Sequence, residues 1–175
     1  MSNKMFEIRP FEMEDAENLC ELMVSNQIHF KEYLPKTLAQ NLTVENSKIY
    51  IAEKQTEIAL NTGFTFGIVE NHSNKIAGII ILKKLDWKKN QGELAYCIDN
   101  KYTGKGWMSQ AVEEISEFAF NELGLRSLQI ITHKSNMASC KVAEKNNFIW
   151  KRTLENEFIP TTGIPIDMEL YELKR

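Results

Sequence analysis

The segment from Ile98 to Ala111 runs from an apolar extended stretch through two glycines directly into a helical pattern. After Gly104-Lys105-Gly106, apolar residues recur at helical spacing at Met108, Val112, Ile115, Ala119 and Leu123. A strand that enters a helix through such a loop presents backbone N–H groups at the positive end of the helix dipole. The segment therefore predicts a strand–helix junction that can hold phosphate, with a flexible turn as the simpler alternative.

Two common nucleotide-binding loops do not fit this spacing. A Walker loop needs a glycine five residues before the Gly-Lys pair and Ser or Thr after it, where this chain has Asp99 and Gly106. A dinucleotide fingerprint needs Gly or Ala where Ser109 stands, and no βαβ half-domain precedes the loop. Neither nucleotide-binding family is therefore indicated.

The remaining pattern predicts a mixed α/β fold. We expect strands near residues 6–10, 64–70, 76–85, 92–99, 128–132, 148–152 and 166–173. We expect helices near residues 12–25, 29–34, 43–60, 107–123 and 136–145. The strand–helix–strand–helix unit from Gly92 to Lys145 lies between antiparallel hairpins, so the sheet should be mixed. No repeat or linker interrupts this order, which predicts a single domain over residues 1–175.

Composition narrows the classes of function. The chain carries 21 Lys and Arg against 24 Asp and Glu, a net charge of −3, without the basic excess typical of nucleic-acid or membrane binding. Its longest apolar run, Ile76–Leu82, is far shorter than a membrane-spanning helix, and the first seven residues lack the apolar core of a secretory signal. We therefore expect a cytoplasmic protein without nucleic-acid or membrane partners.

Cysteines and histidines give no sign of a disulfide framework or a metal site. Cys20, Cys97 and Cys140 are odd in number and far apart, which predicts reduced thiols. The three histidines form no pair with ligand spacing. We expect no metal.

A second candidate for chemistry lies where the helix near residues 136–145 begins. Asn136 and Ser139 are one turn apart and can face the same groove. Ser and Asn are also preferred at helix N-termini, so helix capping is the alternative interpretation. Trp87 and Trp107 are interpreted as packing residues and not as stacking platforms.

Taken together, these motifs resemble the GNAT acyl-CoA N-acyltransferases. The resemblance rests on Gly92–Asp99, the Gly104-Lys105-Gly106 loop, Phe120–Leu125 and the segment from Asn136 to Phe148. Within the family the chain is most similar to the RimJ/RimL group of ribosomal-protein amino-terminal acetyltransferases. The resemblance implies a mostly antiparallel, six- to seven-stranded sheet with a central splayed parallel pair and about four helices. Two departures are Lys101, where the family has Gln or Arg, and Asn147, where it usually has Gly.

The resemblance also implies how acetyl-CoA is bound. The co-substrate would lie where strand 92–99 splays from strand 127–132, with its pyrophosphate on backbone N–H groups between Lys101 and Ser109. Ile98 and its neighbours would pair with the pantetheine like an added strand, and Asn136 would hydrogen-bond its amide. The implied acetyl-CoA contacts are Cys97, Ile98, Asp99, Lys101, Thr103, Gly104, Lys105, Gly106, Trp107, Met108, Ser109, Asn136, Ser139 and Lys145.

The same resemblance implies two catalytic residues. Ser139 would lie near the thioester sulfur and protonate the departing thiolate, and Glu93 would serve as the general base through a water molecule. The alternatives are a structural or solvent-exposed Glu93, and Tyr96 as the acid or base. The chemistry would be acetyl transfer from acetyl-CoA to a primary amine in a ternary complex.

The acceptor amine is less constrained. Deprotonating an α-amino group of pKa near 7.8 at pH 7.4 costs about 0.5 kcal/mol, against about 4 kcal/mol for a lysine amine near 10.4. A distant, water-relayed base suits a protein N-terminus. Small amines (polyamines, antibiotics or amino acids) and a non-catalytic acyl-CoA-binding domain remain alternatives, as do a monomer and a homodimer. The acidic residues Glu12, Glu14, Asp15, Glu17 and Glu21 would either attract a cationic substrate or form a solvated helix face.

Overall fold

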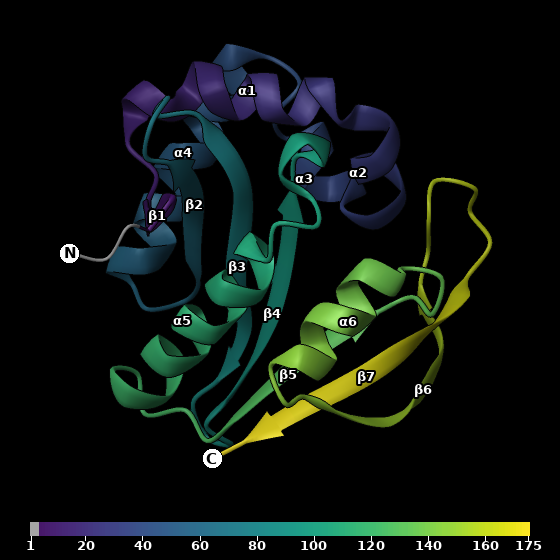
Figure 1. The fold of residues 1–175 in the computed structure, drawn as a ribbon. Coiled ribbons are helices and arrows are strands. Elements are labelled where there is room, and N and C mark those ends of the chain that lie inside the picture. Colours follow the sequence, from purple (N-terminus) through teal and green to yellow (C-terminus); the bar gives the residue numbers. More distant parts are fainter. Residues whose placement is uncertain (1–3) are drawn as a thin grey trace. The chain divides into compact units, whose positions relative to one another are not determined.

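The computed structural model describes residues 4–175 and contains one seven-stranded mixed sheet (Figure 1). The strands are β1 (Phe6–Pro10), β2 (Phe64–Glu70), β3 (Ile76–Asp86), β4 (Gln91–Ile98), β5 (Ser127–Thr132), β6 (Ile149–Phe158) and β7 (Ile166–Lys174). Their order in the sheet is β1-β2-β3-β4-β5-β7-β6, and β4 pairs with β5 in parallel. The predicted mixed α/β fold with a central parallel pair is confirmed.

Six α-helices and two short 3-10 turns complete the described chain. The helices are α1 (Ala16–Ser25), α2 (Gln27–Tyr33), α3 (Pro35–Ala39), α4 (Val44–Ala59), α5 (Trp107–Asn121) and α6 (Met137–Lys145). The 3-10 turns are η1 (Met13–Asp15) and η2 (Asn100–Tyr102). The sequence does not predict α3, because a proline after residues 29–34 indicates the end of a helix. Pro35 instead occupies the first turn of α3, where its missing N–H costs nothing.

The closing strand β6 is longer than the predicted 148–152. Its side chains are exposed over most of its length, so the alternation that marks a half-buried strand is missing from the sequence. Pairing with β7 defines the strand instead, with irregularities between Trp150 and Arg152 and between Leu154 and Phe158. Tertiary pairing has therefore overridden a weak local signal.

The chain forms two compact units. The first contains the chain up to Ile81 together with Tyr96–Trp107. In it β1 and β2 pair antiparallel, from Phe6 opposite Glu70 to Pro10 opposite Phe66, and α1 packs on α4. Its most deeply buried side chains include Phe6, Leu19, Met23, Tyr50, Ile51 and Ile68.

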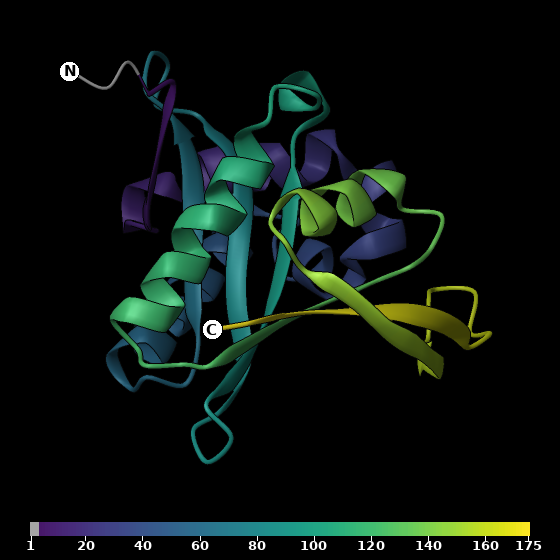
Figure 2. The ribbon, with the colours of Figure 1, turned by 60° about the horizontal axis from the view of Figure 1, so that its bottom comes forward.

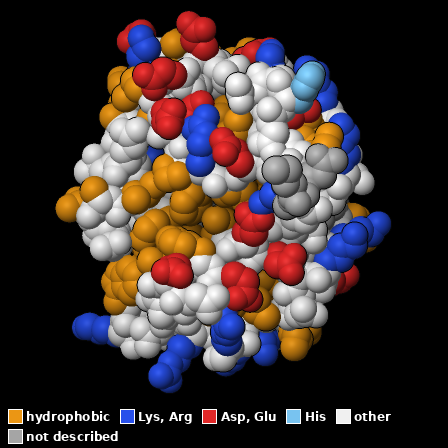
Figure 3. Space-filling view, turned by 60° about the vertical axis from the view of Figure 1, so that its left-hand side comes forward, with side chains coloured by type: hydrophobic (Ala, Val, Ile, Leu, Met, Phe, Trp, Pro, Cys, Tyr) orange, Lys and Arg blue, Asp and Glu red, His pale blue; other side chains and the backbone are white. Residues whose placement is uncertain are grey.

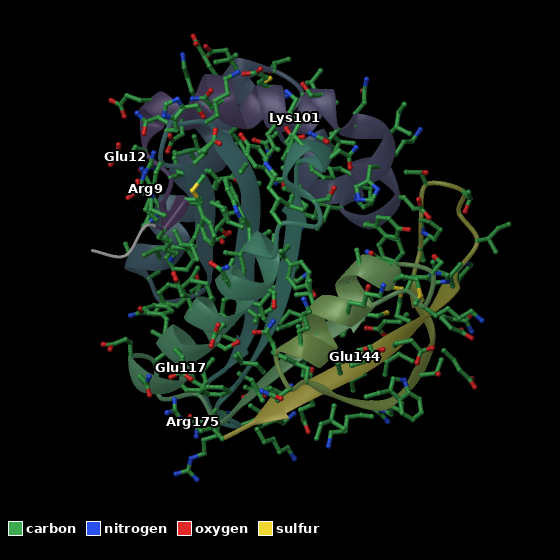
Figure 4. The ribbon with its side chains drawn as sticks, in the orientation of Figure 1. Arg9, Glu12, Lys101, Glu117, Glu144 and Arg175 are labelled. Carbon is green, nitrogen blue, oxygen red and sulfur yellow. The ribbon has the colours of Figure 1, made fainter. Side chains whose placement is uncertain are left out.

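A buried ion pair joins the end of β1 to the start of the first helix. Arg9 Nη1 and Nη2 lie 2.7 and 2.9 Å from the two carboxylate oxygens of Asp15, which is 5% exposed. Asp15 Oδ2 also accepts a hydrogen bond of 2.8 Å from the Glu12 backbone N–H. The two labelled residues Arg9 and Glu12 lie together in Figure 4. Burial works against the charged carboxyl, but the hydrogen bonds from Arg9 and Glu12 lower the pKa of Asp15 overall.

The second unit contains Leu82–Ala95 and Met108–Arg175. β7 lies between β5 and β6, antiparallel to both, and α6 lies beside β5 (Figures 1 and 2). Leu128, Ile130, Ala143 and Phe148 are buried in this unit. The chain end is fixed by Arg175, whose Nη1 lies 3.1 Å from Glu117 Oε2 on α5 (Figure 4).

Three residues singled out in the sequence, Asn147, Trp107 and Trp87, can be compared with the structure. Asn147 has φ +62°, so asparagine supplies the left-handed conformation for which the resembled family uses glycine. Trp107 is buried, as predicted for a packing residue, whereas the packing prediction is wrong for Trp87, which is 44% exposed. In residues 4–175, no helix is long and apolar enough to cross a membrane.

Candidate functional site

The loop between η2 and α5 presents backbone donors to open space. Gly104 and Gly106 have φ +75° and +78°, which side-chain-bearing residues rarely adopt. A Cβ on either glycine would meet nothing within 4 Å. Within the described part of the chain, the N–H groups of Gly104, Lys105 and Gly106 find no acceptor. The loop therefore combines unsatisfied donors, a helix N-terminus and room for a ligand.

The start of this loop is held by side chains of the first unit. Asp99 Oδ1 accepts from the Lys101 backbone N–H at 2.9 Å and caps η2. The Asn100 N–H donates to Oδ1 of the buried Asn26 at 3.1 Å. The Thr103 hydroxyl donates to the Asn100 carbonyl at 2.8 Å. Because the Lys101 N–H is engaged by Asp99, the run of available donors begins at Gly104, three residues later than expected.

Lys105 lies over a pair of aromatic rings. Tyr102 and Trp107 stack with centroids 4.7 Å apart, and Lys105 Nζ is 5.0 Å from the Tyr102 centroid and 5.8 Å from that of Trp107. Trp107 also packs on Phe6. The Tyr102 hydroxyl donates to Glu70 Oε2 at 2.9 Å, and burial together with this carboxylate raises the pKa of Tyr102 to about 12. The two stacked rings thus flank the glycine loop in the sequence and contact Lys105 within it.

Cys97 and Ile98 form the end of β4. A Cβ on Gly78 would lie 2.5 Å from the Cys97 carbonyl oxygen, so only glycine permits this close approach of the two strands. Burial raises the pKa of the Cys97 thiol to about 12, which keeps it protonated and unsuited to nucleophilic chemistry. The parallel pairing of β4 with β5 covers Gln91–Leu94 and does not extend to Cys97 and Ile98.

In the second unit, Asn136 and Ser139 meet at the N-terminus of α6. Asn136 Oδ1 accepts from the Ser139 backbone N–H at 3.2 Å, the arrangement of an N-cap. The capping alternative is therefore correct for the Asn136 oxygen. The Asn136 Nδ2 group has no acceptor among residues 4–175, so the same side chain keeps a donor for a ligand.

The other predicted contacts of this unit lie on α5 and α6. Met108 is buried, whereas Ser109 is half-buried and its Oγ accepts from Asn146 Nδ2 at 3.1 Å. This hydrogen bond ties the first turn of α5 to the end of α6. Lys145 is exposed in the last turn of α6.

Glu93 is buried between two lysines. Its side chain is 9% exposed, with Oε2 2.8 Å from Lys84 Nζ and Oε1 3.3 Å from Lys83 Nζ. Neighbouring strand residues normally point to opposite faces, but Lys84 has φ +50°, and this distortion lets both ammonium groups reach one carboxylate. Glu93 is therefore not the solvent-exposed edge residue of the alternative interpretation.

A pocket of about 310 Å³ opens above Glu93, entirely within the second unit. Its lining includes the polar and charged side chains of Lys84, Gln91, Glu93, Gln129, Arg152 and Glu157. Ile131, Leu154 and Leu170 supply the apolar part. A cavity of this size with a few convergent polar groups is typical of a small-ligand site.

Sequence reasoning missed Lys83, Lys84, Tyr102, Asn146 and Arg152. Two consecutive lysines in a strand pattern predict one on each face, and nothing in the sequence marks the left-handed conformation at Lys84, since lysine does not favour it. Asn146 and Arg152 were missed because their positions depend on tertiary structure: Asn146 donates to Ser109 on α5, and Arg152 lines the pocket from β6. Tyr102, an aromatic residue beside Thr103-Gly104, gave no specific signal.

Two of the five acidic residues near the first helix, Asp15 and Glu21, form ion pairs. Asp15 pairs with Arg9, and both Glu21 oxygens lie about 3 Å from Lys75 Nζ, at 2.9 and 3.0 Å. On the face drawn in Figure 3, acidic and basic side chains are interspersed. These observations favour an ordinary solvated surface over a cation-attracting patch. In the part of the chain that the structure describes, no three His, Cys, Asp or Glu side chains form a group that could hold a metal ion.

The chain matches the model of the acetyltransferase (GNAT) domain over residues 6–149. It is similar to YjcK of Bacillus subtilis (strain 168), which carries the name of an N-acetyltransferase, with 28% identity over 85% of this chain and 82% of YjcK. It is also 28% identical to YdaF of the same organism, named as a ribosomal N-acetyltransferase, over 98% of this chain and 92% of YdaF.

Solved structures share the fold. The ribosomal-protein-S5-alanine acetyltransferase of Vibrio fischeri superposes with a TM-score of 0.91 and 21% identity, covering 99% of this chain and 95% of its own. RimL, the ribosomal L7/L12 α-N-protein acetyltransferase in complex with coenzyme A, superposes with a TM-score of 0.90 and 17% identity. The match covers 99% of this chain and 96% of RimL. The microcin C7 self-immunity acetyltransferase MccE in complex with acetyl-CoA and AMP superposes with a TM-score of 0.88 and 19% identity. The match covers 99% of this chain and 94% of MccE.

Proposed function

Because this chain belongs to the GNAT acetyltransferase family, we propose that it transfers the acetyl group of acetyl-CoA to the α-amino group of a protein N-terminus. The observation that carries the proposal is the glycine loop 104–106, whose N–H groups find no acceptor in the described part of the chain and which has room beside both glycines. Diphosphate is the part of acetyl-CoA that suits such a loop. The family match runs over residues of both units, which supports one catalytic domain over residues 1–175.

In the first unit, the N–H groups of Gly104, Lys105, Gly106 and Trp107 would hold the pyrophosphate. Asp99 and Thr103 act indirectly, by fixing the turn that precedes the loop. Lys101 and Lys105 contribute their positive charges, and Lys105 does so from its position on the Tyr102 and Trp107 rings. Cys97 and Ile98 would offer backbone groups to the pantetheine chain at the end of β4.

In the second unit, Asn136 Nδ2 would donate to a pantetheine carbonyl while its Oδ1 keeps capping α6. The N–H groups of Met108 and Ser109 belong to the first turn of α5 and would extend the row of diphosphate donors. Lys145 is exposed on the last turn of α6, so its role would be electrostatic.

The reaction would be a direct displacement in a ternary complex. The neutral amine attacks the thioester carbonyl carbon, a C–N bond forms and the C–S bond breaks. The nitrogen loses one proton, and the thiolate gains one to leave as CoA. Ser139, in the first turn of α6, would donate the proton to sulfur, and Glu93 would take the amine proton through water.

For Glu93 to take the amine proton through water, Lys83 and Lys84 would have to make room for that water. Lys83 and Lys84 are 42% and 62% exposed, so both can swing into solvent at modest cost, whereas Glu93 is held by its strand. The alternative base, Tyr96, follows Glu93 by three residues in β4 and is half-buried. Glu93 is preferred because it lines a pocket with room for an acceptor.

The acceptor class is supported by the ribosomal acetyltransferases among the similar proteins. A small amine (a polyamine, an antibiotic or an amino acid) is the second candidate, supported by the size of the pocket at Glu93 and by the fold shared with MccE. A non-catalytic acyl-CoA-binding domain is the third. A cytoplasmic location and a monomeric or homodimeric state stay predictions.

Two measurements test the proposal. Acetyl-CoA at about 100 times its Kd should stabilise the protein by about 2.7 kcal/mol and raise the melting temperature by about 5 to 10 °C. CoA release should then be followed with peptides carrying free or blocked N-termini, and with spermidine. Release with free N-termini alone supports the proposal, release with spermidine alone supports the second candidate, and a thermal shift without release on any amine supports the third.

A further inference from the structure

The pocket above Glu93 has an unequal distribution of charge. Glu93 is the most buried charged group of the lining, and its carboxylate forms ion pairs with the ammonium groups of Lys83 and Lys84. One carboxylate therefore meets two positive charges at the floor. Further out the pocket is lined by one guanidinium, on Arg152, and one carboxylate, on Glu157.

Arg152 is available for a ligand. Among residues 4–175, no carboxylate lies within 4 Å of its guanidinium, although the neighbouring Lys151 pairs with Glu172 at 3.7 Å. Arg152 stands at an irregularity in the pairing of β6 with β7, which departs from the regular alternation of side chains. An unpaired guanidinium at a pocket is suited to bidentate binding of a carboxylate.

The lining carries two positive charges (Lys84, Arg152) and two negative ones (Glu93, Glu157), and Lys83 pairs with Glu93 without being part of the lining. Lys83 and Lys84 are paired with Glu93, whereas Arg152 has no carboxylate partner among residues 4–175 and so favours a ligand that brings a negative charge. A primary amine that also carries a carboxylate satisfies both signs, since its ammonium form can meet Glu157 and its carboxylate can meet Arg152.

From this charge pattern we infer that the Glu93 pocket selects acceptor amines that carry a carboxylate close to the amine, with Arg152 as the residue that determines this specificity. The inference rests on the proposed acetyl transfer and narrows its acceptor. The carboxylate has two possible sources, the acidic side chain of a residue next to a protein N-terminus and the α-carboxylate of a free amino acid. In either case a polyamine is a poor acceptor.

Matched acceptors separate the sources. Peptides that begin Ser-Asp and Ser-Asn differ only in charge near the amine, and alanine and alaninamide differ only at the α-carboxylate. The wild-type enzyme should give a kcat/KM about 10-fold higher for the charged member of one pair, and a lower kcat/KM for spermidine than for either. A 10-fold ratio corresponds to about 1.4 kcal/mol.

Arg152→Gln is the informative variant, and Lys151→Gln is its control. Both remove one positive charge from neighbouring positions of β6, but only Arg152 lines the pocket. Arg152→Gln should abolish the preference through the KM of the acidic acceptor and leave the KM for acetyl-CoA unchanged. Lys151→Gln should keep the preference.

The outcomes distinguish this inference from the proposed function. Equal kcat/KM for charged and neutral acceptors, or a preference that survives in Arg152→Gln, overturns the inference while acetyl transfer stands. If no amine is acetylated, the proposed function fails, and titration of alanine against alaninamide, followed by amide NMR shifts around Glu93 and Arg152, still tests the pocket. Equal shifts for the two compounds would overturn the inference there as well.

Discussion

Asn136 Oδ1 accepts a hydrogen bond from the Ser139 backbone N–H over 3.2 Å, so the two residues that the sequence marks as candidates for chemistry contact each other through an N-cap. The cap uses only the oxygen of the Asn136 amide. Its nitrogen remains a donor, so the structural role and the proposed binding role belong to two different atoms of one amide. A single substitution can separate them.

Asn136→Asp keeps the capping oxygen and removes the Nδ2 donor. Aspartate is as good an N-cap as asparagine, so the melting temperature should change by no more than about 2 °C, corresponding to about 0.5 kcal/mol. Acetyl-CoA binding should weaken by about 10-fold, because the lost donor would leave a pantetheine carbonyl facing a carboxylate. Thermal unfolding and isothermal titration with acetyl-CoA measure the two effects. Unchanged acetyl-CoA affinity in a well-folded Asn136→Asp protein would remove Asn136 from the binding site.

The glycine loop offers a controlled test of its anion-binding role. Gly104→Ala forces a side chain into φ +75°, and Gly163→Ala does the same at φ +79° in the turn between β6 and β7, again with nothing within 4 Å. Each substitution should cost about 1 kcal/mol of stability through backbone strain. Only Gly104→Ala should lower the affinity for acetyl-CoA, and the loss should be smaller for dephosphorylated pantetheine thioesters that lack the diphosphate. Equal affinity losses in the two variants would mean that the loop has no special part in binding.

The sequence was most informative where a residue's role is local. The strand–glycine–helix junction at Gly104 follows from a short-range pattern and appears as predicted. The environment of Glu93 could not be predicted, because it depends on a strand distortion at Lys84 and on contacts from β6, both set by tertiary structure. The engagement of the Lys101 N–H by Asp99 was likewise hidden, since the spacing allows the contact but does not require it.

Glu93→Gln tests the proposed base against a matched control. Glu172 is also nearly buried, 14% exposed, and lies 3.7 and 3.3 Å from two lysines, Lys151 and Lys174. Glu93→Gln and Glu172→Gln should therefore destabilise the protein to a similar extent. If Glu93 relays the amine proton, only Glu93→Gln should lower kcat, by about 100-fold. Equal kcat values in the two variants would assign Glu93 a structural role.

The ion pair of Arg9 with Asp15 predicts a pH-dependent part of the stability. Hydrogen bonds from Arg9 and Glu12 lower the Asp15 pKa in the folded state, against an unfolded value of about 3.9. A lowered folded pKa means that the contribution is fully present above the unfolded pKa and is lost as the pH falls through the folded pKa. Asp15→Asn should cost about 2 kcal/mol at pH 7, because it leaves the Arg9 guanidinium, 25% exposed, without its carboxylate. Urea unfolding of both proteins between pH 7 and pH 3 measures this, and the difference between them should shrink below about pH 4. A difference that stays constant over that range would show that Asp15 stabilises the fold by hydrogen bonding alone and not by its charge.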